Sequence, residues 1–171
     1  MLAKALHDEL KFESAITRKF LELLPEDKLD WAPHPKSMKL GRLAGHLAEL
    51  PGWGTNTIQL EQLDIMPVDG PRYTGLAVQS RAQALEALDA NAAGALSALA
   101  SCEDASLMQP WSLLAGGRTL MTMPRVAVLR GMVLSHTVHH RAQLGVYYRL
   151  LDIPVPATYG PSADEQKMPG Q

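Results

Sequence analysis

The residues best suited to chemistry in this chain are its histidines. Three of the six fall between residues 136 and 140. A neutral imidazole is a good ligand for zinc-like ions, and imidazoles spaced three or four residues apart on a helix can reach a common point. The pattern therefore indicates a metal site, provided that the surrounding residues form a helix.

Spacing on a helical wheel separates these three histidines. At roughly 100° per residue, a wheel centred on Leu129 places His136 and His140 about 20° to either side, inside the apolar stripe. His139 falls about 80° away, at the edge of that stripe, and Arg141 falls on the opposite, polar side. Two imidazoles one turn apart on a buried stripe carry a desolvation cost that a shared ion would offset. The pair 136/140 is therefore favoured over 136/139.

A third ligand is needed, because zinc-like ions that keep a position open for water or substrate use about three protein ligands. His46 is the best candidate, since it adjoins Leu43 and Leu47 on a second apolar helical stripe. Helical bundles build metal sites from inward-facing residues on neighbouring helices. An alternative stays open, in which each histidine is a hydrogen-bonded core residue with no metal.

Helical periodicity recurs in four segments, and the proline and glycine clusters fall between them. This pattern predicts an all-α four-helix bundle. Ser37 is expected to cap the second helix, and Pro51-Gly52 is expected to interrupt and kink it. The predicted helices are Leu2–Leu24, Ser37–Leu63, Gln79–Ala100 and Pro124–Leu151.

The connections predict further features. The fifteen or so residues of Asp64–Val78 are long enough for a crossover. Trp111–Leu114 and Arg118–Met121 flank Ala115-Gly116-Gly117, which is typical of a short β-hairpin before the last helix. Residues 152–171 are rich in proline and should run extended over the bundle. We expect residues 1–171 to form a single domain.

Composition excludes several classes of protein. Hydrophobic residues make up 46% of the chain and charged residues 20%, which is typical of a globular domain. Sixteen Lys and Arg against eighteen Asp and Glu, with no dense basic stretch, argue against a nucleic-acid partner. No apolar run is long enough for a membrane span. The single cysteine, Cys102, and the absence of a signal-peptide core predict a cytoplasmic protein.

Three segments of the sequence are distinctive: GRLAGHLAELPGW at 41–53, SHTVHHRAQL at 135–144 and IPVPATYGPSADE at 153–165. They resemble the DinB-like proteins of bacteria, which are related to the YfiT-like metal-dependent hydrolases. The resemblance spans almost the whole chain. It implies a four-helix bundle with long crossover connections, commonly a homodimer, and a divalent metal that is often nickel or zinc. The implied ligands are His46, His136 and His140.

The resemblance implies a metal-dependent enzyme, either a hydrolase or a thiol-dependent transferase that acts on a small molecule. The open coordination position would take water, a thiol cosubstrate or substrate. The alternative is a non-catalytic bundle that binds a metal or small ligand for sensing or sequestration. Three residues are further candidates: Glu49 as a proton acceptor or histidine-orienting group, Trp53 at the pocket mouth, and Gln143 as a ligand contact. A solvated glutamate, a packing tryptophan and a bundle-edge glutamine are the ordinary readings of the same residues.

Overall fold

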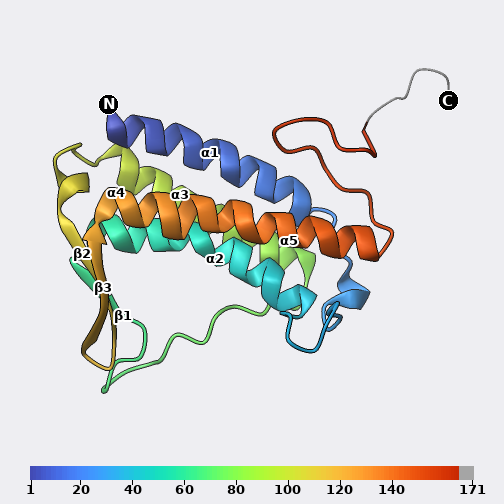
Figure 1. Cartoon of the computed structure of the whole chain (residues 1–171), viewed down its shortest axis with the longest axis horizontal. Helices are drawn as coiled ribbons and strands as arrows, with labels where there is room; N and C mark the ends of the chain where they lie inside the picture. The colour runs from blue at the N-terminus through green and yellow to red at the C-terminus, as the bar shows by residue number, and fades with distance from the viewer. Residues whose placement is uncertain (166–171) are drawn as a thin grey trace.

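The protein, described over residues 1–165 by a computed structural model, is built around four long helical rods (Figure 1). The fourth rod has three consecutive parts, which Figure 1 shows as one continuous helix. The four-helix prediction is confirmed, with most helix ends shifted by only a few residues. The helices are α1 (Leu2–Leu21), α2 (Leu40–Gln59), α3 (Arg81–Ala100), α4 (Arg125–Val128), a π-helical segment (Leu129–Ser135) and α5 (His136–Leu150).

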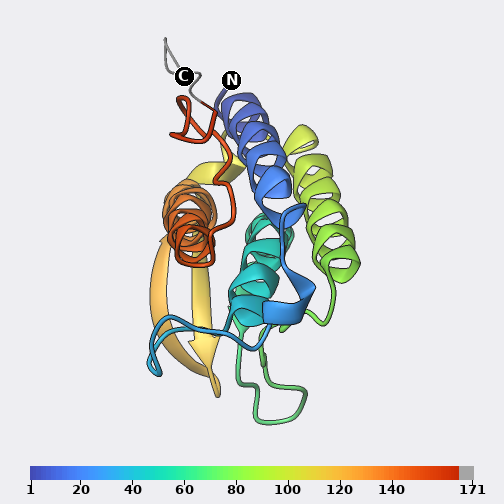
Figure 2. The same ribbon diagram turned by 90° about the vertical axis from the view of Figure 1, so that its right-hand side faces the viewer.

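Viewed along the bundle, α1 lies beside α3, α3 beside α2, and α2 beside α5 (Figure 2). Helices α2 and α3 run in the same direction (Figure 1). The connection between them must therefore travel back along the bundle, which explains its length. The predicted long crossover is confirmed.

Helix α2 corrects the prediction of a break at Pro51. The helix runs from Leu40 to Gln59 with Pro51 buried inside it. A proline there removes one backbone donor, and the side chain of Asn91 reaches in from α3 to donate to the carbonyl of Ala48 at 3.0 Å. Gly52 allows this approach, because a Cβ at that position would lie 2.5 Å from Asn91 Oδ1. Helix α2 therefore continues through Pro51 and packs closely against α3 at this point.

Both ends of α2 also differ from the prediction. The N-cap is Lys39, whose side chain makes no capping hydrogen bond, and Ser37 lies outside the helix. At the other end the chain leaves the helix after Gln59 and enters a strand, β1 (Gln62–Asp64), where helix was expected to Leu63.

A small three-stranded sheet closes one end of the bundle. Strands β2 (Pro110–Ala115) and β3 (Arg118–Pro124) form the predicted antiparallel hairpin, and β1 pairs with β2 in parallel. The carboxylate of Asp64 accepts hydrogen bonds from the amides of Gly116 and Gly117 at 3.0 and 2.7 Å. Both glycines have positive φ, which allows the tight turn between β2 and β3. The hydrogen bonds to Asp64 of β1 hold this turn in place.

The π-helical segment changes which face of α5 is buried. A wider turn rotates the following helix relative to an uninterrupted wheel drawn from Leu129, and the buried face of α5 includes Thr137, Leu144 and Tyr148. Arg141 therefore lies inside the bundle with 1% exposure. The prediction that Arg141 belongs to the polar side is wrong for this reason.

After α5 the chain follows the bundle without forming a helix or strand up to residue 165. Asp164 pairs with Arg149 of α5 at 2.6 Å and accepts a hydrogen bond from the amide of Val155 at 2.9 Å. The part of the predicted extended tail at residues 166–171 lies outside the described residues. Over residues 1–165, none of the helices has the length and apolar character needed to span a bilayer.

Candidate metal centre

Three histidines from two helices meet between α2 and α5. His46 comes from α2, and His136 and His140 come from the first two turns of α5. His136 Nε2 lies 2.8 Å from His140 Nε2 and 3.4 Å from His46 Nε2. One nitrogen from each ring lies within 4.8 Å of the others. The three residues proposed from the sequence are thus brought together.

The second nitrogen of each ring on α5 is held by a neighbour. His140 Nδ1 lies 2.7 Å from Gln143 Oε1, and His136 Nδ1 lies 3.3 Å from the carbonyl of Met132. Both neighbours are acceptors, so both Nδ1 atoms carry the proton and donate it. The Nε2 lone pairs are consequently free, and they point toward one another.

The acceptor for the His136 side chain lies in the π-helical segment. The backbone amide of His136 bonds to the carbonyl of Val133, one residue closer than in a regular α-helix. The carbonyl of Met132, one residue earlier, lies 3.3 Å from Nδ1 of the His136 side chain. π-Helical turns are frequent at functional sites, and this one had no signal in the residue pattern that we used.

Burial favours neutral imidazoles at this position. His140 is 7% exposed, and the side chain of His46 is 12% exposed. Burial, together with the nearby His46 and His136, lowers the pKa of His140 to about 4, although the hydrogen bond to Gln143 opposes the change. Burial and the charge of His46 also lower the pKa of His136. Metal ligation requires neutral histidines, and the lowered pKa values of His136 and His140 favour that form of both rings.

The donor set fits a divalent cation. Three neutral imidazoles with converging lone pairs repel one another unless a proton or a cation lies among them. Nitrogens bound tetrahedrally to an ion at about 2.0–2.1 Å would lie about 3.3 Å apart. The distance from His136 Nε2 to His46 Nε2 is close to this value at 3.4 Å, whereas the 2.8 Å to His140 Nε2 is shorter and would have to widen around an ion. Nickel, zinc, copper and iron all suit imidazole ligands, so the donor set does not select the metal.

Glu49 is half-buried beside His46, where it is not a solvated surface residue. Its Oε1 lies 2.9 Å from Arg42 Nη1 and 3.8 Å from His46 Nδ1. Its Oε2 accepts from the hydroxyl of Tyr73 at 2.8 Å and the amide of Leu76 at 2.9 Å. Burial acts to raise the pKa of Glu49, but these neighbours outweigh it and the pKa is lowered. The carboxylate therefore anchors the α2–α3 connection beside a candidate ligand.

His46 differs from the other two histidines in its second nitrogen. Its Nδ1 is buried and has no hydrogen-bond partner among residues 1–165. The nearest carboxylate oxygen, on Glu49, is too distant for a direct hydrogen bond. A small movement of Glu49 toward the ring would complete the set of oriented imidazoles.

The other residues that the sequence suggested for the site lie at different positions in the structure. Trp53 and Glu49 both line a cavity of about 430 Å³ between α2 and α3. Gln143 contacts His140 directly, as described above. His139 is exposed, and its ring centroid lies 4.8 Å from that of His140.

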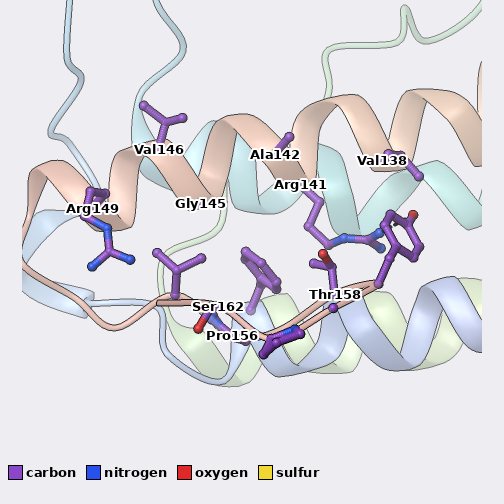
Figure 3. A pocket seen from close by; sticks show the side chains of 14 residues that line it. Val138, Arg141, Ala142, Gly145, Val146, Arg149, Pro156, Thr158 and Ser162 are labelled. Atoms are coloured by element: carbon purple, nitrogen blue, oxygen red, sulfur yellow. Dashed lines mark hydrogen bonds between the residues drawn. The ribbon is translucent and has the colours of Figure 1, made fainter. Parts of the chain in front are cut away.

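A second cavity of about 430 Å³ lies between α5 and the C-terminal segment, away from the histidines (Figure 3). Figure 3 shows Arg141 reaching from α5 toward this segment. Arg141 pairs with buried Glu13 of α1 at 2.6 Å, and the hydroxyl of Tyr159 lies 2.8 Å from the same guanidinium nitrogen. The sequence analysis missed this cluster. Its signal was Glu13 itself, an acidic residue between Leu10 and Phe20 on an apolar stripe.

Comparisons with known proteins agree with the fold. A DinB-like protein from Bacillus cereus ATCC 10987 superposes with a TM-score of 0.67 at 21% identity, covering 91% of this chain and 97% of that one. The DinB-like protein YjoA from Bacillus subtilis superposes with a TM-score of 0.66 at 15% identity, covering 96% and 99%. Among curated proteins, none matches significantly.

The family assignment comes from the sequence of the chain itself. The family model of the DinB superfamily matches residues 9–144, well over half of the chain. This region includes all three converging histidines. The protein is therefore a member of the DinB superfamily.

Proposed function

We propose that this protein binds a divalent metal ion, zinc or nickel, through Nε2 of His46, His136 and His140. The observation that carries the proposal is the convergence of three Nε2 atoms whose α5 rings are each oriented through Nδ1. Superfamily membership supports it. The three imidazoles leave the charge of a dication uncompensated, so an anion is expected at the open position.

We further propose that the metal-bound protein is an enzyme, either a hydrolase or a thiol-dependent transferase acting on a small molecule. A divalent ion in such a site lowers the pKa of a bound water or thiol and so supplies a nucleophile near neutral pH. Gln143 and the Met132 carbonyl keep two rings oriented. Glu49 is the nearest carboxylate to His46 and is the candidate to receive a proton.

A non-catalytic role in metal or small-ligand binding is the second candidate. It is favoured by the contacts of Glu49, whose two oxygens already accept three hydrogen bonds. A carboxylate so engaged is a weaker general base than a free one. This candidate predicts that Glu49→Gln changes no measurable turnover.

Elemental analysis of untagged protein tests the metal proposal. Wild-type protein is expected to contain about one equivalent of metal per chain, and His140→Ala is expected to lose it. His139→Ala is the matched control, because His139 is exposed one residue away. Equal metal content in the two variants, or none in the wild type, would overturn the proposal.

Two measurements distinguish the enzyme classes. Cobalt-substituted protein should change its visible spectrum when a low-molecular-weight thiol is added, if a thiol occupies the open position. Ester, amide and phosphate panels test hydrolysis. Metal-loaded protein without turnover on these panels or in thiol conjugation would favour the non-catalytic role.

The remaining properties are proposals of the same kind. We propose that residues 1–171 form one domain, that the chain acts as a homodimer in the bacterial cytoplasm, and that it contacts neither nucleic acid nor membrane. The formal charge of −2 and the lack of a dense basic stretch support the exclusion of nucleic acid.

A further inference from the structure

The cavity between α2 and α3 has the size of a small-molecule site. Its volume of about 430 Å³ falls within the range of roughly 300–1,000 Å³ that is usual for such sites. The three converging histidines do not line it. Glu49 connects the two places, since it borders the cavity and lies 3.8 Å from His46.

Two aromatic rings form one corner of this cavity. Trp53 projects from α2 and Tyr73 from the α2–α3 connection, with ring centroids 5.6 Å apart and ring planes at 85°. The faces of aromatic rings carry partial negative charge and attract cations, most strongly at tryptophan. The two rings meet edge to face, and a ring face that borders the cavity can contact a cation.

The charge that lines the cavity is negative, so it also favours a cation. Glu49 is the one charged side chain among the described residues that line it, and the other polar side chains there are neutral. Arg42 pairs with Glu49 at 2.9 Å but does not line the cavity. The wall therefore combines a carboxylate with two aromatic rings, which favours a cationic ligand over a neutral or anionic one.

The hydrogen bonds of Glu49 indicate which type of cation the cavity would bind. Its oxygens already accept from Arg42, Tyr73 and the amide of Leu76. A quaternary ammonium has no N–H to donate, and its charge spreads over methyl groups that contact rings well. Such a group fits this wall better than a primary amine or guanidinium, which would need new acceptors.

A second aromatic pair shows that the ring geometry alone does not make a site. Trp31 and Tyr147 have ring centroids 5.5 Å apart and planes at 84°. Tyr147 is 7% exposed and donates its hydroxyl to the carbonyl of Met38, and Trp31 is partly buried against the same core cluster. Trp53 is likewise partly buried against the core. The Trp53 corner differs in its open cavity and its carboxylate.

We propose that the α2–α3 cavity binds a small molecule bearing a quaternary ammonium group, with the cation against Trp53 and Tyr73 and near Glu49. The proposal is independent of the metal, because the histidines do not line this cavity. It adds a second binding site to the proposed function.

Choline and its neutral isostere, 3,3-dimethylbutan-1-ol, test the proposal in calorimetric titrations of the full chain with and without zinc. The two probes share shape and differ in charge. Choline is expected to bind at least about tenfold more tightly, whether or not zinc is present. Equal affinities for the two probes would overturn the proposal, even if the histidines hold metal.

Variants identify the site. Trp53→Leu is expected to weaken choline binding about tenfold, whereas Trp31→Leu, the same change in the second aromatic pair, leaves it unaltered. Glu49→Gln should weaken binding of choline but not of the alcohol, which a general loss of structure would not do. Equal effects of the two tryptophan variants on choline would contradict the proposal.

A variant outside the aromatic corner tests the proposal even if Trp53→Leu does not fold. Ala90 is exposed on α3 and lines the cavity, so Ala90→Leu fills space without disturbing the core. It is expected to weaken choline binding at an unchanged thermal midpoint. Undiminished choline affinity in Ala90→Leu would place the ligand elsewhere and overturn the proposal.

Discussion

Gln143 is an exposed residue that orients one ring of the histidine cluster. Its Oε1 lies 2.7 Å from His140 Nδ1 and holds the ring so that Nε2 faces His136. Partners of this type fix the tautomer and orientation of a metal-ligating histidine. A residue that looks like a surface polar group in the sequence is therefore part of the site.

Gln143→Leu is expected to weaken metal affinity about 10- to 100-fold, because His140 loses its oriented tautomer. Competition with a chromophoric chelator measures the change. Gln59→Leu removes the same amide from the exposed end of α2 and should leave metal affinity unchanged. If both variants bind metal like the wild type, Gln143 has no orienting role.

Arg141 and Glu13 form a buried ion pair between α5 and α1. Their side chains are 2% and 7% exposed, and Arg141 also bonds to the Glu13 carbonyl and to Thr17. Removing one partner of a buried pair leaves an uncompensated charge. We expect Arg141→Met to lower the free energy of unfolding by about 3–5 kcal/mol, measured by urea denaturation.

The double variant Glu13→Leu with Arg141→Met distinguishes two causes of instability. One is the loss of the attraction between the two side chains, and the other is the burial of an unpaired Glu13 carboxylate. Replacing both charges with apolar groups is often close to neutral for stability. The double variant should therefore be more stable than Arg141→Met alone. A double variant as unstable as the single one would show that packing at Arg141, not charge, dominates.

At the scale of elements, close backbone approach holds the α2–α3 connection over α2. A Cβ at Gly45 would lie 2.1 Å from the carbonyl oxygen of Leu76. The amide of Leu76 bonds to Glu49, one turn farther along α2. The glycine therefore allows the connection to reach the carboxylate beside His46.

Gly45→Ala is expected to destabilise the fold by about 1–3 kcal/mol, because the connection must move away from the added methyl group. The amide of Leu76 should also exchange faster with solvent. Gly131→Ala is the control, since nothing lies within 4 Å of a Cβ built there. Equal stability of the two variants would contradict the close approach.

The positions of the helices follow from the local periodicity of apolar residues. The irregularities within the helices depend on contacts with other parts of the chain. The periodicity of the four segments sufficed to place the helices within a few residues. It did not reveal the continuity of α2 through Pro51 or the π-helical turn before His136. Strand β1 was missed because a three-residue strand exists only through its pairing with β2.

At the scale of the whole molecule, Asp104 links the start of α1 to the segment that follows the neighbouring helix α3. Its carboxylate accepts from the amides of Ala3 at 2.8 Å and Leu2 at 2.9 Å. Met1 makes no side-chain cap for this helix, so the cap comes from a residue about a hundred positions away. Hydrogen bonding by Ala3, the terminal amine and Leu2 lowers the pKa of Asp104 to about 2.

This lowered pKa predicts a pH dependence of stability. The ordinary value is 3.8, so the unfolded chain binds the proton more readily than the folded one. The stabilisation is present above about pH 4 and is lost as pH falls toward about 2. Asp104→Asn should lose less stability than the wild type between pH 5 and 2, measured by thermal midpoints. Parallel loss in both proteins would contradict this role.

The sequence by itself determined the four helices and the shared face of His136 and His140, because both depend on residues within one or two helical turns. It also pointed to His46, from its position on an apolar stripe. Only the tertiary structure decided that these imidazoles meet, that Arg141 lies inside and that Glu49 anchors a distant loop. Those outcomes depend on helix rotation, a π-helical turn and partners far apart in the chain, and no local periodicity records them.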